Sequence, residues 1–177
     1  INSFSFMPAF AVASAGAILS GQAIGADHKD HVPIIAKLTL KVNVIWQGLV
    51  SIVYLALPAL LFAPFAPNPA EGAVLARTGT HLLMLSATWQ LFDATATTMA
   101  EILRSAGDTT FTLWARVLLA WLVFVPGAYL TTRYAGWGES GAVFWLASYL
   151  ALLAGVLILR FARGAWRRIQ ITEPTVS

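Results

Sequence analysis

The chain is a succession of long apolar stretches separated by short polar connections. A helix needs about 20 residues to cross the hydrocarbon core of a bilayer, at a rise of about 1.5 Å per residue. Five stretches have about this length, covering approximately residues 4–25, 42–65, 79–103, 111–132 and 141–160. The pattern predicts an all-α fold, a polytopic membrane bundle of about five transmembrane helices within residues 1–168, followed by a tail over residues 169–177.

The composition agrees with a membrane protein and excludes a soluble fold. Hydrophobic residues make up 58% of the chain and charged residues 11%, and the mean hydropathy is +0.73. A soluble domain carries about 25% charged residues, because water must wet its surface. The absence of cysteine excludes a disulfide framework and a thiolate metal site. His28 and His31 have no third ligand nearby in the sequence, so we expect no metal site there.

The basic residues predict the orientation of the bundle. With five crossings, the first and third connections and the C-terminus lie on one side of the membrane. That side carries nine basic residues: Lys29, Lys37, Lys41, Arg104, Arg116, Arg160, Arg163, Arg167 and Arg168. The other side carries two, Arg77 and Arg133. Because basic residues favour the cytoplasmic side, we expect a multi-pass plasma-membrane protein with a cytoplasmic C-terminus. The same asymmetry explains the net charge of +3 without a nucleic-acid partner, and the basic tail is expected to meet anionic headgroups.

The first apolar stretch begins almost at the start of the sequence, which opens at Ile1. No basic segment precedes this stretch and no cleavage site follows it, so it does not have the pattern of a signal peptide. We therefore expect an internal or C-terminal piece of a longer protein. An authentic short protein is the alternative.

Small residues recur every four positions along the first stretch, in the order Ala9, Ala13, Ala17, Gly21 and Gly25. Small residues at this spacing let helix backbones approach closely, and Gly21 and Gly25 are predicted to be the tightest part. Gln22 lies beside this stripe. It is expected either to hydrogen-bond to a neighbouring helix or to contact a solute directly.

The third stretch carries an acidic residue, Asp93, near its middle. An aspartate at the centre of a bilayer costs about 2.5–3.5 kcal/mol, so such residues usually face a cavity or a partner. Ser86, Gln90 and Thr97 share its helical face and form a polar stripe that lipid cannot cover. Two interpretations remain open. Asp93 either exchanges a proton or binds a monovalent cation in a water-accessible cavity, or it ties helices together.

A second acidic residue, Glu101, lies near the end of the same stretch. An ion pair with Arg104 or Arg116 is its simplest interpretation. Eight residues separate it from Asp93, which is about 12 Å along a helix. The two carboxylates are therefore too far apart to act on one bond, and we do not expect an enzyme.

Two motifs resemble a known transporter family. Residues 15–26, AGAILSGQAIGA, are similar to the helix end with the pattern Gly-Gln-x-x-Gly-Ala in the multidrug and toxic-compound extrusion (MATE) family. Residues 101–109, EILRSAGDT, resemble that family's Leu-Arg-Gly-Ala-Gly-Asp-Thr turn, with Ser105 in place of a glycine. Arg104, Gly107 and Asp108 are the expected core of this cytoplasmic turn.

The resemblance covers almost the whole chain and implies helices eight to twelve of a twelve-helix transporter made of two lobes. It implies alternating-access export of amphipathic, often cationic, compounds, coupled to proton or sodium entry and without another cofactor. Asp93 lies at the position of an acidic residue that takes part in cation coupling in the NorM-like branch. The N-terminal lobe and an acidic partner on helix seven would lie outside this sequence. A lipid-linked oligosaccharide flippase of the same superfamily and a non-transport membrane subunit are the alternatives.

Overall fold

The computed structural model describes residues 2–57, 60–61, 69–134, 136 and 138–169. All the regular elements within these residues are helical. The longer helices are α1 (Asn2–Gly25), α2 (Val32–Ala56), α4 (Pro69–Ser105), α5 (Thr109–Leu119), α6 (Val125–Arg133) and α7 (Gly138–Ala162). Three short turns accompany them: η1 (Lys29–His31) and η4 (Ala165–Arg168) are 3-10 helices, and η3 (Ala120–Phe124) is a π-helix.

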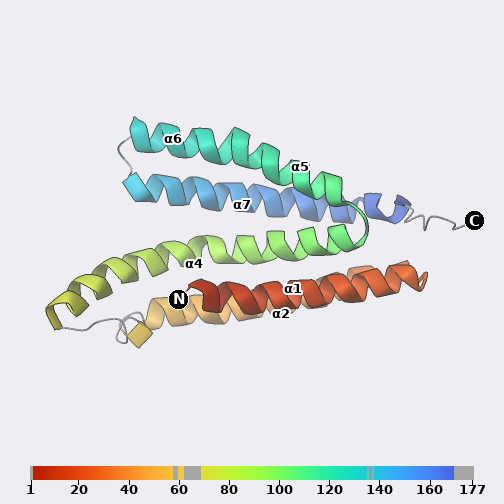
Figure 1. Ribbon diagram of the computed structural model, residues 1–177, viewed down its shortest axis with the longest axis horizontal. Helices are drawn as coiled ribbons and strands as arrows, with labels where there is room; N and C mark the ends of the chain where they lie inside the picture. The colour runs from red at the N-terminus through yellow and green to blue at the C-terminus, as the bar shows by residue number, and fades with distance from the viewer. Residues whose placement is uncertain (1, 58–59, 62–68, 135, 137, 170–177) are drawn as a thin grey trace, which may run out of the picture.

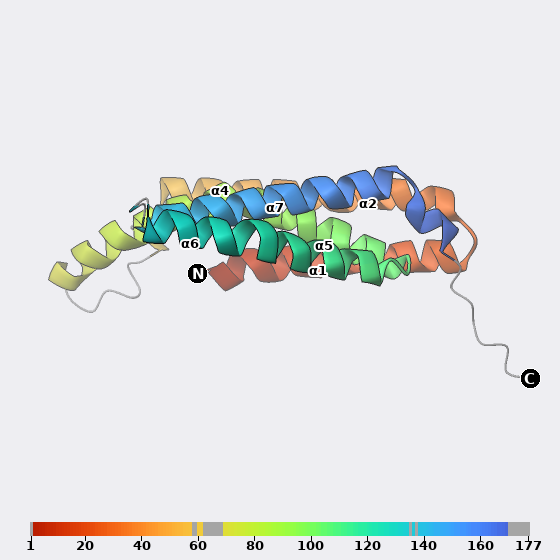
Figure 2. The same cartoon turned by 90° about the horizontal axis from the view of Figure 1, so that it is seen from above.

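The helix α4 lies at the centre of an elongated bundle (Figures 1 and 2). It packs against α1 and α2 on one side and against α7 on the other, while α6 packs on α7. The turn from α1 to α2, the turn from α4 to α5 and the C-terminal end of α7 lie together at one end of the bundle (Figure 1). The first and third connections therefore share one end with the basic C-terminal segment, as the sequence pattern predicts.

The distribution of side chains is that of a membrane helix bundle. Ile18 and Ile52 are 62% exposed and Leu122 is 71% exposed, whereas Asn43 and Gln47 are at most 2% exposed. Many large apolar side chains thus face outward while several polar side chains are buried, which suits a lipid solvent rather than water.

Among the described residues, four helices are long and apolar enough to cross a membrane by length and composition. They are Ser5–Gly25, Lys29–Ala56, Thr109–Arg133 and Ser140–Ala162. The third predicted span falls on α4, which is not among the four because polar residues interrupt its apolar sequence. It nevertheless runs alongside them through the middle of the bundle (Figure 1).

The second span begins earlier than the sequence pattern suggests. The helix α2 starts at Val32, with Pro33 in its first turn, so residues 32–41 are helical although Lys37 and Lys41 mark them as polar. It ends at Ala56 because Leu57, with φ −129° and ψ 40°, precedes a proline, which disfavours helical backbone. The predicted end near residue 65 lies outside the described residues, as does most of the tail over 169–177.

The fourth predicted span is a continuous helical rod with a wide turn inside it. The π-helical η3 joins α5 to α6, and Pro126 follows in the first turn of α6. A proline ring clashes with the carbonyl four residues earlier, here Leu122, and the wide turn relieves that clash. Gly127 then lies buried against the indole of Trp145 on α7, where a Cβ atom would collide with the ring.

The close approach of α1 to its neighbours does not occur at Gly21 and Gly25. A Cβ at Gly21 would have only Ser105 near it, at 3.9 Å, and a Cβ at Gly25 would have no heavy atom within 4 Å. A Cβ at Gly16 would instead collide with Thr39 of α2. A strict four-residue repeat turns by about 40° at each step, so the small-residue stripe winds away from α2 along the helix. Gln22 is exposed at that end.

Candidate functional site

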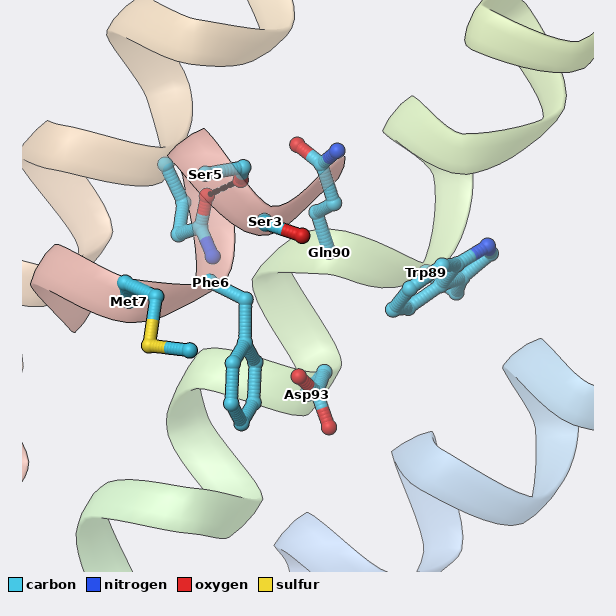
Figure 3. Close-up of a pocket in the computed structure, with 8 residues that line it drawn as sticks. Ser3, Ser5, Phe6, Met7, Trp89, Gln90 and Asp93 are labelled. Atoms are coloured by element: carbon cyan, nitrogen blue, oxygen red, sulfur yellow. Dashed lines mark hydrogen bonds between the residues drawn. The ribbon is translucent and has the colours of Figure 1, made fainter. Parts of the chain in front are cut away.

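Asp93 lines a pocket of about 270 Å³ between the first turns of α1 and the middle of α4. Ser3, Ser5, Phe6 and Met7 of α1 line one side of it. Trp89, Gln90 and Asp93 of α4, with Gln47 of α2, complete the lining. Figure 3 shows the Asp93 carboxylate beside the ring of Phe6, with the indole of Trp89 on the other side. The predicted central carboxylate therefore faces a cavity.

Within the described part of the chain, no hydrogen bond or ion pair reaches the Asp93 carboxylate. The half-buried side chain is available to a ligand in the pocket. The nearby walls are the aromatic rings of Phe6 and Trp89 and the thioether of Met7. One anionic group among aromatic and thioether groups is a suitable environment for an amphipathic cation, because π faces attract positive charge.

Two groups from other helices lie within range of an electrostatic interaction with Asp93. Arg116 of α5 and the phenol of Tyr149 on α7 lie close enough to interact with it electrostatically. From the sequence, either Arg104 or Arg116 was expected to pair with Glu101. In the structure Glu101 pairs with Arg104, with 2.7 Å between Oε1 and Nη1. Arg116 is therefore not the ion-pair partner of Glu101, and its positive charge would compete with a cation in the pocket for Asp93.

The predicted polar stripe around Asp93 divides into two parts. Gln90 lies in the pocket wall, 2% exposed, and its Oε1 accepts a 3.3 Å hydrogen bond from Ser51 of α2. The Gln90 Nε2 atom is buried, and none of the described residues forms a hydrogen bond with it. Ser86 and Thr97 are half-buried and do not line the pocket. Gln90 is thus the supporting residue that the structure brings beside Asp93.

Polar residues on α2, which were not predicted from the sequence, complete the site. Gln47 accepts a 2.5 Å hydrogen bond from the Ser5 hydroxyl, and the indole N–H of Trp46 donates to the Ser5 carbonyl at 3.1 Å. Asn43 donates to Thr98 of α4 at 2.7 Å. The signal was present as a four-residue repeat of polar positions along an apolar helix: Thr39, Asn43, Gln47 and Ser51. These bonds hold α1, α2 and α4 together around the pocket.

The turn from α4 to α5 is built as a helix end with a left-handed glycine. Gly107 has φ +86°, and its N–H donates to the carbonyl of Arg104. The Asp108 N–H donates to the carbonyl of Leu103 in the same turn. This arrangement satisfies the last carbonyls of α4, and the positive φ explains the glycine. It also directs the Asp108 side chain toward α7.

Asp108 forms the most buried ion pair in the described residues. Its two carboxylate oxygens accept hydrogen bonds from Arg160 Nε at 2.8 Å and Nη2 at 3.3 Å. The Arg160 guanidinium also lies 4.5 Å from the ring centre of Phe111. The motif residue Asp108 therefore fastens the α4–α5 turn to the end of α7.

These features define an all-helical membrane bundle with a pocket that sets one carboxylate among mainly apolar walls. The profile of the MatE family matches residues 1–130, and the chain belongs to this family. It is 25% identical over 168 residues to a probable multidrug resistance protein NorM of Thermotoga maritima, covering 95% of this chain and 35% of that protein. A NorM of the same description from Mesorhizobium japonicum is 28% identical over 165 residues, which cover 92% of this chain and 35% of the relative.

A third relative carries a different name. The multidrug resistance protein MdtK of Photorhabdus laumondii is 25% identical over 174 residues, covering 97% of this chain and 37% of that protein. The chain therefore spans about a third of the length of the curated relatives it matches. No solved structure is significantly similar to it.

Proposed function

We propose that this chain is part of a secondary transporter that exports amphipathic cations in exchange for inward-moving protons or sodium ions. The observation that carries the proposal is the Asp93 carboxylate in an aromatic-walled pocket between α1, α2 and α4, where no hydrogen bond or ion pair from the described residues reaches it. Membership of the MatE family and the names of its relatives support export of drugs and other toxic compounds.

Exchange follows from competition for one negative charge. A proton or a sodium ion neutralises the Asp93 carboxylate and removes its attraction for a cationic solute. A bound solute cation likewise excludes the coupling ion. Gln47 and Gln90 supply amide oxygens at the same pocket. Because each ligand displaces the other, movement of the coupling ion down its gradient drives the solute in the opposite direction.

Transport also requires that the pocket open alternately to the two sides of the membrane. In the proposed transporter, the lobe that contains this chain rocks against a second, N-terminal lobe around a central cavity. The end of the bundle that carries the C-terminal arginines faces the cytoplasm of the cell, because that end holds the excess of basic residues.

A lipid-linked oligosaccharide flippase is the alternative within the same architecture. Its pyrophosphate would require arginine or lysine side chains in the cavity. The lining of the described pocket contains a carboxylate and no basic residue. This charge favours a cationic solute.

The test compares Asp93→Asn with wild type in the protein that contains this chain, reconstituted into proteoliposomes. Ethidium export is followed under an imposed proton gradient and, separately, under an imposed sodium gradient. An interaction with a charged group contributes about 1.5–3 kcal/mol, so we expect coupled export to fall by about tenfold to a hundredfold. Glu101→Gln is the matched control, because it removes a carboxylate from the same helix at a surface ion pair.

Comparison of the two variants distinguishes a specific role of Asp93 from a general effect of removing a negative charge from α4. Export by Glu101→Gln should remain within about twofold of wild type, since its ion pair with Arg104 is a surface contact. If Asp93→Asn exports as well as wild type under both gradients, Asp93 is not the coupling site. Equal losses in both variants would also contradict the proposal.

A further inference from the structure

The end of α7 continues into a turn that is fixed in place. Gly164, with φ +68°, reverses the chain after α7, and η4 follows at once. Trp166 in this turn is 3% exposed, and its ring stacks on Phe161 with a centroid separation of 5.4 Å. The Trp166 indole N–H donates to the Phe161 carbonyl at 3.1 Å. The buried Trp166 therefore fixes the backbone of the turn that carries the basic residues.

A second pocket, of about 520 Å³, opens at this turn. Phe161, Trp166 and Pro33, which comes from the first turn of α2, supply apolar surface to its lining. Arg163, Arg167 and Arg168 supply three guanidinium groups. All three arginines are exposed.

The charge around the pocket is strongly positive. Lys29 of η1 lies beside it and donates to the Arg167 carbonyl at 3.5 Å. Asp30 approaches Arg167 at 3.6 Å, but the two side chains are 93% and 48% exposed, so this contact neutralises little. The Arg167 guanidinium lies 5.3 Å from the Trp166 ring centre, which leaves its N–H groups available to an anion.

The pocket also lies at the end of a candidate membrane span. The candidate membrane span of α7 ends at Ala162, the residue before Arg163. The arginines therefore follow directly after the candidate span, where a chain that leaves the bilayer meets phospholipid headgroups. Guanidinium groups bind phosphate oxygens in a bidentate manner, and the aromatic floor suits the glycerol and upper acyl chain of a lipid.

We infer that this pocket, formed by Arg163, Arg167 and Arg168 over Trp166 and Phe161, binds the phosphate headgroup of an anionic phospholipid. The position at the end of a membrane span and the combination of apolar floor with cationic rim favour a lipid over a free anion. Binding there would join η4 to the α1–α2 turn through one ligand.

The test measures retention of phosphatidylglycerol and phosphatidylcholine by the purified protein in detergent micelles, using native mass spectrometry. Wild type should retain phosphatidylglycerol in preference to phosphatidylcholine. Arg163→Gln/Arg168→Gln should weaken phosphatidylglycerol binding by about twentyfold to thirtyfold, and Arg168→Gln alone by about fivefold, as expected for the contribution of each basic residue near a charged headgroup. Circular dichroism and size-exclusion elution establish that the variants are folded.

The matched control is Lys37→Gln/Lys41→Gln, which removes the same charge from exposed positions of α2 that do not line the pocket. This variant should bind phosphatidylglycerol with nearly wild-type affinity. A loss as large as in the arginine double variant would overturn the inference, because any surface charge would then suffice. Displacement of the lipid by an equal concentration of inorganic phosphate would also overturn it, since the pocket would then be a site for the free anion.

Discussion

The ion pair between Asp108 and Arg160 fastens the α4–α5 turn to α7, and its contribution to the free energy of unfolding can be predicted from its burial. The Asp108 side chain is 6% exposed and the Arg160 side chain is 32% exposed. Removing one member of a buried pair costs about 3–5 kcal/mol, because the other charge stays buried without a partner. Arg160 can regain water on its exposed side, so Asp108→Ala should lower the free energy of unfolding by a smaller amount, about 2–3 kcal/mol.

The same turn contains its own control. Glu101 and Arg104 also form an ion pair, with 2.7 Å between the charged atoms, but their side chains are 19% and 40% exposed. Exposed pairs contribute about 0–1 kcal/mol, so Glu101→Ala should cost less than about 1 kcal/mol. Two ion pairs a few residues apart thus differ in expected contribution because they differ in burial.

The assay is reversible unfolding in mixed micelles of increasing dodecyl sulfate content, followed by far-ultraviolet circular dichroism. Arg160→Ala and the double variant complete a mutant cycle with Asp108→Ala. Because the two residues share hydrogen bonds, the cycle should show a coupling of about 1–3 kcal/mol. Additive effects of the two substitutions, or equal losses for Asp108→Ala and Glu101→Ala, would refute the reasoning.

Two further predictions concern helix packing and use the same unfolding assay. Gly127→Ala should cost about 1–3 kcal/mol because its methyl group meets the Trp145 ring, whereas Gly155→Ala on α7 should be neutral or stabilising by up to about 1 kcal/mol because nothing lies within 4 Å of its Cβ position. A shift of the same sign in both variants would contradict this packing. Asn43→Ala should cost about 1 kcal/mol, near the usual range for a polar contact between membrane helices, because it loses the hydrogen bond to Thr98. If Thr98→Val destabilises Asn43→Ala as much as it destabilises wild type, the bond does not contribute.

The sequence predicted the helices well because the length of an apolar stretch is a local property. The same pattern missed the start of α2, where Lys37 and Lys41 suggest a connection although both lie on the exposed face of a regular helix. The end of that helix depends on Leu57, whose conformation reflects the proline after it. Boundaries therefore required information about neighbouring residues as well as average hydropathy.

The candidate site was predictable in part for a similar reason. The cost of placing Asp93 in a span is a property of one residue, and it indicated a cavity. The partners around the pocket come from α1 and α2, and a single sequence does not state which helix faces which. The small-residue stripe on α1 was also predicted without knowledge of which helix it faces. The buried positions of α1 instead follow an uneven spacing of four, four, three and four residues: Ser5, Ala9, Ala13, Gly16 and Ser20. Only that uneven spacing keeps them on one face of the helix.

The π-helical turn η3 affects how the continuous helix formed by α5, η3 and α6 would respond to the loss of a residue. A π-helical turn accommodates one more residue than an α-helical turn would hold in the same place. Loss of one residue between Ala120 and Phe124 would convert it to ordinary α-helix and keep the face that α6 presents to α7, while it would restore the clash of Pro126 with a preceding carbonyl. Loss of one residue within α5 would instead rotate α6 by about 100° and move Gly127 away from Trp145. The rod therefore has one short segment where its residue count can vary without altering the face that α6 presents to α7.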